Sequence, residues 1–243
     1  MINTSHGGQR IAKLELLTYP FVWRLAHFLG NLQTREISYQ NIFFESSRRL
    51  GIDIPFYPIG GAANASLLYL ILRVCLDSDV RSVLELGVGQ STILLHELRK
   101  LKPLEITSVE HDAAWAGFVG KQVDHEVIVA PLRAASIDGV DTQVYDVKGE
   151  LGDRRFDLMI VDGPVGFNVR RRSRWGCIEF VRKHLADDYV MIIDDAHRRG
   201  EMDTVKHLRT LLDARGPCHV GLAMGACAQI VLASERFRHV VMF

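Results

Sequence analysis

A glycine-containing run over residues 84–91, Leu-Glu-Leu-Gly-Val-Gly-Gln-Ser, carries the most informative chemical pattern of the sequence. Gly87 and Gly89 allow a tight turn from a strand into a helix and let a ligand approach the backbone closely. The pyrophosphate-binding spacing G-x-G-x-x-G is incomplete, because Thr92 stands where the third glycine would be. The carboxylate of Glu85 would repel a pyrophosphate but attract a ligand that carries an ammonium or sulfonium group.

A second acidic residue follows the next apolar run, in the sequence Val-Glu-His-Asp that ends at Asp112. Glu110 lies about 20 residues past the glycines, where an acidic residue accepts hydrogen bonds from the hydroxyls of a ribose. The two pieces are weak separately, but their order and their positions at the ends of successive strands reinforce each other. Together they predict a site for an adenosine-containing ligand.

Three further carboxylates follow two later strands: Asp162 follows one, and Asp194 and Asp195 follow the other. The carboxyl ends of adjacent parallel strands border the ligand crevice of an open sheet, so these side chains are expected to converge. Such an oxygen cluster suits a hard divalent cation such as Mg²⁺. A general base or a residue that orients the substrate is the alternative role for the same carboxylates, and a structural role is the third. His197 could also act as a general base to a hydroxyl, or be a surface histidine at a helix start.

Arginines are clustered just after the same two strand ends. Arg170, Arg172 and Arg174 follow Asp162, and Arg198 follows His197. Guanidinium groups suit carboxylates and phosphates, so these arginines predict an anionic substrate such as a uronic acid, a phosphorylated sugar or a nucleotide-linked glycan. The alternatives are a solvated loop, or pairing of Arg172 or Arg174 with Asp162 or Asp195.

Short apolar runs alternate with helical patterns from residue 81 onward. This alternation predicts an α/β, Rossmann-like, doubly wound and mostly parallel seven-stranded sheet, covered on both faces. The last two strands have no helix between them and predict an antiparallel terminal hairpin. The expected strands are 82–86, 106–109, 126–130, 156–161, 189–193, 219–223 and 228–233, and the expected helices are 92–101, 113–122, 173–184 and 201–214.

The first 60 residues have a different texture, with many aromatic residues at helical spacing. We expect residues 1–60 to form a helical N-terminal appendage, and residues 61–243 to form the main domain. The appendage would cover the ligand cleft as a substrate lid or provide a homodimer contact.

Composition limits the class of protein. The 243 residues carry 29 Lys and Arg against 29 Asp and Glu, which argues against a polybasic nucleic-acid binder. Hydrophobic residues make up 48% of the chain, enough for a sizeable core. No apolar run resembles a secretory signal or a membrane span, and the scattered cysteines suit reduced thiols, so a cytoplasmic location is expected.

The ordered motifs resemble those of the class I S-adenosylmethionine-dependent methyltransferases. The resemblance rests on residues 85–89, Glu110, residues 156–163 (Phe-Asp-Leu-Met-Ile-Val-Asp-Gly) and residues 192–195 (Ile-Ile-Asp-Asp), and it covers roughly residues 60–243. It implies S-adenosylmethionine as the cofactor, with adenine near residues 130–132. The residues that it implies for cofactor binding are Glu85, Gly87, Gly89, Gln90, Ser91, Glu110 and His111.

The resemblance implies methyl transfer, most directly to a hydroxyl of a small molecule or glycan. In similar metal-using O-methyltransferases an Asp after strand four and an acidic pair after strand five hold the ion, which implies Asp162, Asp194 and Asp195 here. These relatives usually continue with a histidine-containing loop, where this chain has Gly-Pro-Val-Gly. Catalytic roles would fall to Asp162, Asp194 and His197. An N-methyltransferase acting on an amine or a nucleic-acid base, and a non-catalytic cofactor-binding or scaffolding domain, are the alternatives.

Overall fold

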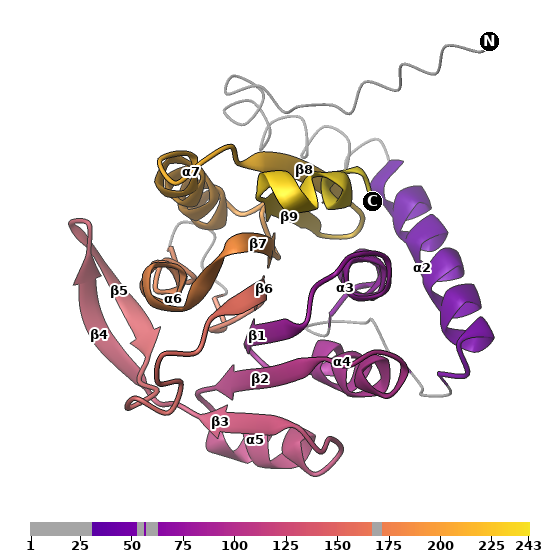
Figure 1. The fold of residues 1–243 in the computed structure, drawn as a ribbon, viewed down its shortest axis with the longest axis horizontal. Coiled ribbons are helices and arrows are strands. Elements are labelled where there is room, and N and C mark those ends of the chain that lie inside the picture. Colours follow the sequence, from indigo (N-terminus) through magenta and orange to yellow (C-terminus); the bar gives the residue numbers. More distant parts are fainter. Residues whose placement is uncertain (1–30, 53–55, 57–62, 167–171) are drawn as a thin grey trace.

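The computed structural model describes residues 31–52, 56, 63–166 and 172–243. A seven-stranded sheet lies at the centre of this part, with helices on both faces (Figure 1). The strands of this sheet are β1 (Ser82–Leu86), β2 (Glu105–Glu110), β3 (Glu126–Val129), β6 (Phe156–Val161), β7 (Leu185–Ile193), β8 (His219–Met224) and β9 (Ala228–Ala233). The helices are α2 (Asn31–Arg49), α3 (Ala65–Asp77), α4 (Gln90–Leu101), α5 (Ala113–Gly120), α6 (Cys177–His184), α7 (Arg199–Asp213) and the 3₁₀ helix η1 (Glu235–Met242).

The strand order of the sheet is β3-β2-β1-β6-β7-β9-β8. β1, β2, β3, β6 and β7 pair in parallel, whereas β9 runs antiparallel to both β7 and β8. The chain builds outward from β1 to β3 and then returns to place β6 on the other side of β1. The carboxyl ends of β1 and β6 therefore form the switch point at which sheets of this type bind ligands. The predicted doubly wound sheet with an antiparallel terminal hairpin is confirmed.

Alternation along each strand divides the apolar residues between two cores. Leu158 and Ile160 of β6 pack with α2, α3, α4 and η1 on one face of the sheet. Met159 and Val161 pack with α6 and α7 on the other face. This alternation follows from the period of two in a strand, and it explains why strands buried on both faces have near-continuously apolar sequences.

Helix α2 is tied to the ligand edge of the sheet by one carboxylate. Glu36 Oε1 accepts a hydrogen bond from the Ala65 amide at 2.6 Å, and its Oε2 accepts one from the Ala226 amide at 2.9 Å. These amides lie at the start of α3 and in the turn between β8 and β9. Residues 1–30 and most of 53–62 fall outside the described part, so the appendage proposed for residues 1–60 stays a prediction beyond α2.

A second, two-stranded sheet was not predicted. β4 (Leu132–Ile137) and β5 (Val140–Tyr145) form an antiparallel hairpin beside α6 (Figure 1). Its turn carries Asp138 and Gly139, both with positive φ, which is the backbone of a tight hairpin turn. Among the boundaries that differ from the prediction, β7 begins earlier, at Leu185, and α6 begins later, at Cys177.

Among the described residues no helix has the length and apolar character that crossing a membrane requires.

Candidate active site

The glycine turn lies at the switch point of the sheet and touches the neighbouring strand end. Gly87 has a φ of +94°, and a Cβ there would lie 2.8 Å from the amide nitrogen of Gly163. The Gly87 amide donates to Val109 O at 2.9 Å, which joins the turn to β2. Gly89 differs, because a Cβ there would meet no atom within 4 Å. The two glycines therefore serve different ends: Gly87 permits close packing, and Gly89 leaves open space above the turn, where α4 begins with Gln90 and Ser91.

Glu85 lies buried beneath the glycine turn. Its side chain is fully buried, and its Oε2 accepts hydrogen bonds from Ser108 Oγ at 2.7 Å and Thr92 Oγ1 at 2.8 Å. The Gly89 amide in turn donates to Thr92 Oγ1 at 2.9 Å. Burial raises the pKa of Glu85 to about 7, against the hydrogen bonds of nearby hydroxyls. Through these bonds Glu85 supports the glycine turn, and its predicted contact with a cofactor stays a prediction.

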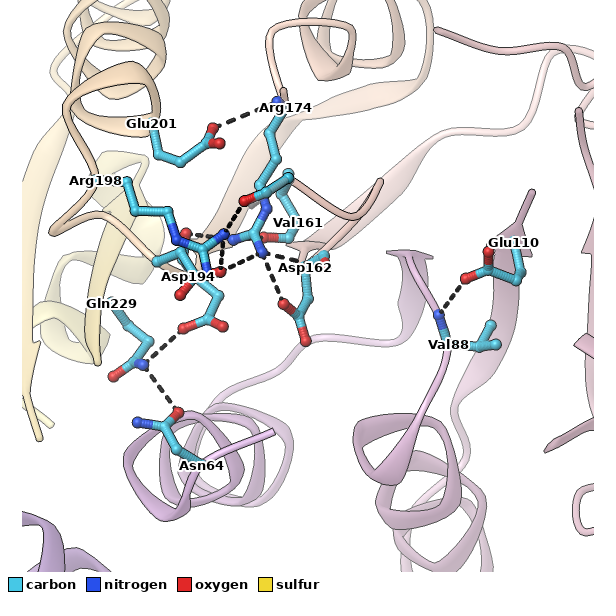
Figure 2. A network of polar contacts seen from close by, with 12 residues as sticks. Asn64, Val88, Glu110, Val161, Asp162, Arg174, Asp194, Arg198, Glu201 and Gln229 are labelled. Carbon is cyan, nitrogen blue, oxygen red and sulfur yellow. Dashed lines mark hydrogen bonds and ion pairs between the residues drawn. The ribbon is translucent and has the colours of Figure 1, made fainter. Parts of the chain in front are cut away.

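Glu110 ends β2 directly opposite the turn, with 5% of its surface exposed. Its Oε2 accepts a hydrogen bond from the Val88 amide at 3.2 Å (Figure 2). Its Oε1 accepts from the amides of His111 and Asp112, and the His111 ring nitrogen Nδ1 lies 2.6 Å from the same oxygen. These contacts fix the carboxylate against the glycine turn, so Glu110 and Gly89 border the same space.

The three aspartates at the ends of β6 and β7 converge as predicted. One oxygen from each of Asp162, Asp194 and Asp195 lies within 4.8 Å of the others. Burial and the neighbouring Asp194 raise the pKa of Asp162 well above its usual value. Burial and Asp195 raise the pKa of Asp194 in the same direction. A cluster of this kind retains a proton more readily than isolated carboxylates do, because each negative charge disfavours the others.

Arg174 fills the centre of this cluster (Figure 2). Its guanidinium is 3% exposed and lies 3.0 Å from Asp162 Oδ1 and 2.7 Å from Asp195 Oδ2. It also donates to Asp194 O at 2.5 Å. Burial lowers the pKa of Arg174, but the surrounding carboxylates outweigh burial and raise it above its usual value. Pairing of Arg174 with the aspartates, the alternative to substrate binding, is what the structure contains.

The carboxylate cluster does not fit a divalent ion. The guanidinium of Arg174 bridges Asp162 and Asp195, and Arg198 Nη1 lies 2.9 Å from Asp195 Oδ2 as well. The amide of Gln229 donates to Asp194 Oδ1 at 2.7 Å, which engages the third carboxylate (Figure 2). A Mg²⁺ ion would have to displace these donors and lie beside two fixed positive charges.

The other predicted arginines are also engaged. Arg198 Nη1 donates to Gly166 O at 2.6 Å, in addition to its ion pair with Asp195. Arg172 lies 3.4 Å from Asp203 and stacks over the Trp175 ring. Arg170 lies outside the described residues. The described arginines of this group therefore bond to carboxylates and main-chain oxygens of the protein itself. None of them by itself supports the prediction of an anionic substrate.

His197 lies beside the cluster, within 4.8 Å of ligand atoms of Asp195 and Cys227. The chain turns sharply after β7, because Asp195 has a φ of +57°, an uncommon conformation for a residue with a side chain. The Arg198 amide donates to Asp195 O at 2.8 Å and closes this turn. His197 therefore leaves β7 on the same loop as the two aspartates, as the sequence order predicts.

Several residues of the site were missed by sequence reasoning. Gln229 of β9 connects Asp194 to Asn64, whose Oδ1 accepts a hydrogen bond at 3.1 Å (Figure 2). Tyr145 of β5 is buried, and burial and the Glu110 charge raise the pKa of its phenol well above the usual value. The Trp115 indole donates to Val88 O at 2.7 Å and holds the glycine turn from α5. The predicted antiparallel direction of β9 could have placed Gln229, because the start of an antiparallel strand lies beside the carboxyl end of its parallel neighbour β7.

No protein-family model and no curated protein sequence matches this chain. Solved structures with a similar fold include the O-methyltransferase from Bacillus cereus in complex with SAH, at a TM-score of 0.49 and 14% identity, covering 89% of this chain and 100% of that one. They also include the SAH-bound methyltransferase PaMTH1 from Podospora anserina, at a TM-score of 0.48 and 13% identity, covering 79% and 87%.

The strand order decides the fold class. A parallel sheet with the switch point between β1 and β6, closed by a strand that runs antiparallel between β7 and β8, is the arrangement expected from the motif resemblance. The fold is a Rossmann-like, doubly wound α/β fold with an antiparallel terminal hairpin. In this fold the glycine turn, Glu110 and the three aspartates all lie at the carboxyl edge of the sheet, where doubly wound folds bind their ligands.

Proposed function

We propose that this protein is an S-adenosylmethionine-dependent methyltransferase that acts on a hydroxyl group of a small molecule or glycan. The observation that carries the proposal is the glycine turn held against Glu110 at the switch point. The turn leaves open space at Gly89, and a buried carboxylate faces that space from β2. This pairing suits a ligand with a ribose and a cationic centre, and it does not need the third glycine of a pyrophosphate site.

The residues of the chain fit the cofactor in a simple way. Glu110 would accept hydrogen bonds from the ribose hydroxyls, and the amides around Gly89 would contact the methionine part above the turn. Ala130 is buried, donates its amide to Glu110 O at 2.7 Å and begins the β3–β4 connection, near which the adenine would lie. When bound, the cofactor supplies an electrophilic methyl group on a sulfonium centre.

Asp162 is the residue we assign to proton removal. Its side chain is 24% exposed, against 9% for that of Asp195. Asp162 directly follows β6 and lies next to the glycine turn. Burial and the neighbouring Asp194 raise the pKa of Asp162 above its usual value, which makes the deprotonated carboxylate a stronger base than an exposed aspartate. Arg174 fixes the orientation of Asp162, so the acceptor oxygen can be held in line with the methyl group. Asp194, bonded to Gln229, positions the loop instead of meeting the substrate.

We propose an uncharged hydroxyl as the acceptor group. The three described arginines that could have bound an anion are paired with aspartates or with main-chain oxygens. The aspartate cluster would also repel a carboxylate or phosphate placed close to Asp162. A metal-free route to the alkoxide through Asp162 therefore suits the site better than one that depends on Mg²⁺.

Calorimetry with S-adenosylhomocysteine tests the cofactor assignment. Glu110→Ala should weaken binding by about 10-fold or more, because one or two hydrogen bonds to a charged group are lost. Glu105→Ala, at the exposed start of the same strand, is the matched control and should leave the affinity unchanged. Absence of binding by the unaltered protein would refute the methyltransferase proposal.

The acceptor class is tested by following S-adenosylhomocysteine release with panels of neutral and anionic sugars, phenols and amines. Turnover with neutral hydroxyl compounds, and loss of turnover in Asp162→Asn with cofactor binding intact, is the expected result. Turnover restricted to amines would overturn the hydroxyl assignment and favour the N-methyltransferase alternative.

A further inference from the structure

A second group of side chains that can coordinate a metal lies away from the aspartate cluster, between α4 and the start of β3. His96 of α4 meets Asp124 and His125, which directly precede β3. His96 Nδ1 lies 3.0 Å from Asp124 Oδ1, and one ligand atom from each of the three residues lies within 4.8 Å of the others. Two imidazoles and a carboxylate form a typical donor set for a borderline transition-metal ion.

His125 provides an independent indication of a ligand. It is 9% exposed, and its Nδ1 is buried with no hydrogen-bond partner among the described residues. A buried ring nitrogen without a partner is uncommon, because it forgoes the hydrogen bonds that water would supply. A metal ion coordinated at this nitrogen would satisfy it.

The hydrogen bonds of His125 set its tautomer. Ser108 Oγ donates its single proton to Glu85 Oε2 at 2.7 Å, so its 3.2 Å contact with His125 requires that His125 Nε2 carries the other proton. The lone pair of a neutral ring then lies on Nδ1. A neutral imidazole whose other nitrogen donates toward a carboxylate through one hydroxyl is the form that binds metals.

We propose that His96, Asp124 and His125 bind a divalent transition-metal ion of the zinc type, with water completing the coordination. The ion would join α4 to β3, the edge strand of the seven-stranded sheet. It would also fix the chain of hydrogen bonds from His125 through Ser108 to Glu85, which supports the glycine turn. Arg99 opposes the ion, because its Nη1 lies 3.0 Å from Asp124 Oδ1 and must move aside on binding.

Zinc titration of the full chain, read by competition with a chromogenic chelator, tests the site. Asp124→Asn and His96→Gln should each weaken Zn²⁺ binding by about 10-fold or more, because each removes a direct ligand. Arg99→Gln should tighten binding by a few-fold, because the competing cation is lost. Asp124 has a side-chain exposure of 72%, so Asp124→Asn is expected to fold normally.

The matched control is His219→Gln, which removes a histidine from a different exposed pair, with Nε2 2.6 Å from Glu235 Oε2. It should leave Zn²⁺ affinity unchanged. Absorption of bound Co²⁺ in the visible region, lost in Asp124→Asn and kept in His219→Gln, would independently support coordination at this site. Equal Zn²⁺ affinity in the unaltered protein, Asp124→Asn and His96→Gln would overturn the proposal, as would loss of binding only in His219→Gln. The measurement needs no methyl transfer, so its outcome is independent of the proposed enzyme activity.

Discussion

Replacement of Gly87 by alanine should destabilise the protein through two separate effects. The positive φ of Gly87 costs an alanine about 1–2 kcal/mol in backbone strain. The new Cβ would also lie 2.8 Å from the amide nitrogen and 3.0 Å from Cα of Gly163, both main-chain atoms that cannot rotate away. Overpacking of this kind costs about 1–3 kcal/mol. The expected loss in the free energy of unfolding is therefore about 2–5 kcal/mol.

Two other glycines separate these effects. Gly139 has a φ of +74°, but a Cβ there would meet nothing within 4 Å, so Gly139→Ala should lose only the strain of about 1–2 kcal/mol. Gly89 has an extended φ of 176° and open space around its Cβ position. Gly89→Ala should therefore cost at most about 1 kcal/mol, the usual loss on placing alanine at a helix N-cap.

Urea unfolding measures the three stabilities, and calorimetry with S-adenosylhomocysteine measures the affinities. Gly89→Ala should fold like the unaltered protein yet bind the ligand at least about 10-fold more weakly, because its methyl group fills the space assigned to the cofactor. If Gly87→Ala is no less stable than Gly139→Ala, the close approach of β1 and β6 is refuted. If Gly89→Ala binds with unchanged affinity, the cofactor does not lie above the turn.

Three further predictions follow from the buried charges. The pKa of Glu85 rises from its usual value of 4.5 to about 7 on folding, so the folded state binds the proton more tightly than the unfolded state does. The free energy of unfolding should therefore fall by up to about 3 kcal/mol between pH 4.5 and pH 8. Urea titrations measure this dependence, and Glu85→Gln should remove it. Arg174→Met should destabilise the protein by about 3–5 kcal/mol, whereas Arg172→Met, at a half-exposed arginine, should cost less than about 1 kcal/mol. Thermal unfolding that shows a smaller difference between the two variants would contradict the central role of Arg174. Methyl transfer should survive EDTA, whereas Asp162→Asn should lower kcat by about 100-fold at unchanged cofactor affinity; inhibition by EDTA that Mg²⁺ reverses would restore the metal hypothesis.

The main sheet could be predicted because its strands are buried on both faces. Their near-continuously apolar runs separated by helical patterns leave few arrangements other than a doubly wound parallel sheet. The face of the sheet toward which Glu85 points could also have been predicted. Glu85 lies two residues after Val83, which packs in the core beneath α3 and α4, and alternate residues of a strand share a face.

The hairpin of β4 and β5 escaped prediction for a physical reason. One face of the hairpin is exposed, with Ala134, Ser136, Asp141 and Gln143 among its residues, so its apolar pattern is weak. The Asp138–Gly139 turn was the readable signal. Tyr145, the last residue of β5, was not predicted as a site residue for the same reason.

The role of Arg174 could not be settled from the sequence, because spacing does not tell which side chain folds inward. Arg172 and Arg174 lie two residues apart in the same run, yet one pairs at the surface with Asp203 and the other is buried among the aspartates. The contact between Asn64 and Gln229 joins residues far apart in the chain and depends on the completed sheet. Long-range pairings of this kind determine the chemistry of the cleft but leave no local pattern.

Arg174 also has a mechanical consequence for substrate selection. Its guanidinium bonds to the ends of both β6 and β7, so these two strand ends cannot separate without exposing buried carboxylates. If the acceptor binds beside Asp162, as proposed above, this side of its site is rigid before any substrate arrives, and induced fit there is costly. Adaptation to acceptors of different shape would then have to come from segments that the guanidinium does not join, such as α2, which Glu36 bonds to the start of α3 and to the β8–β9 turn.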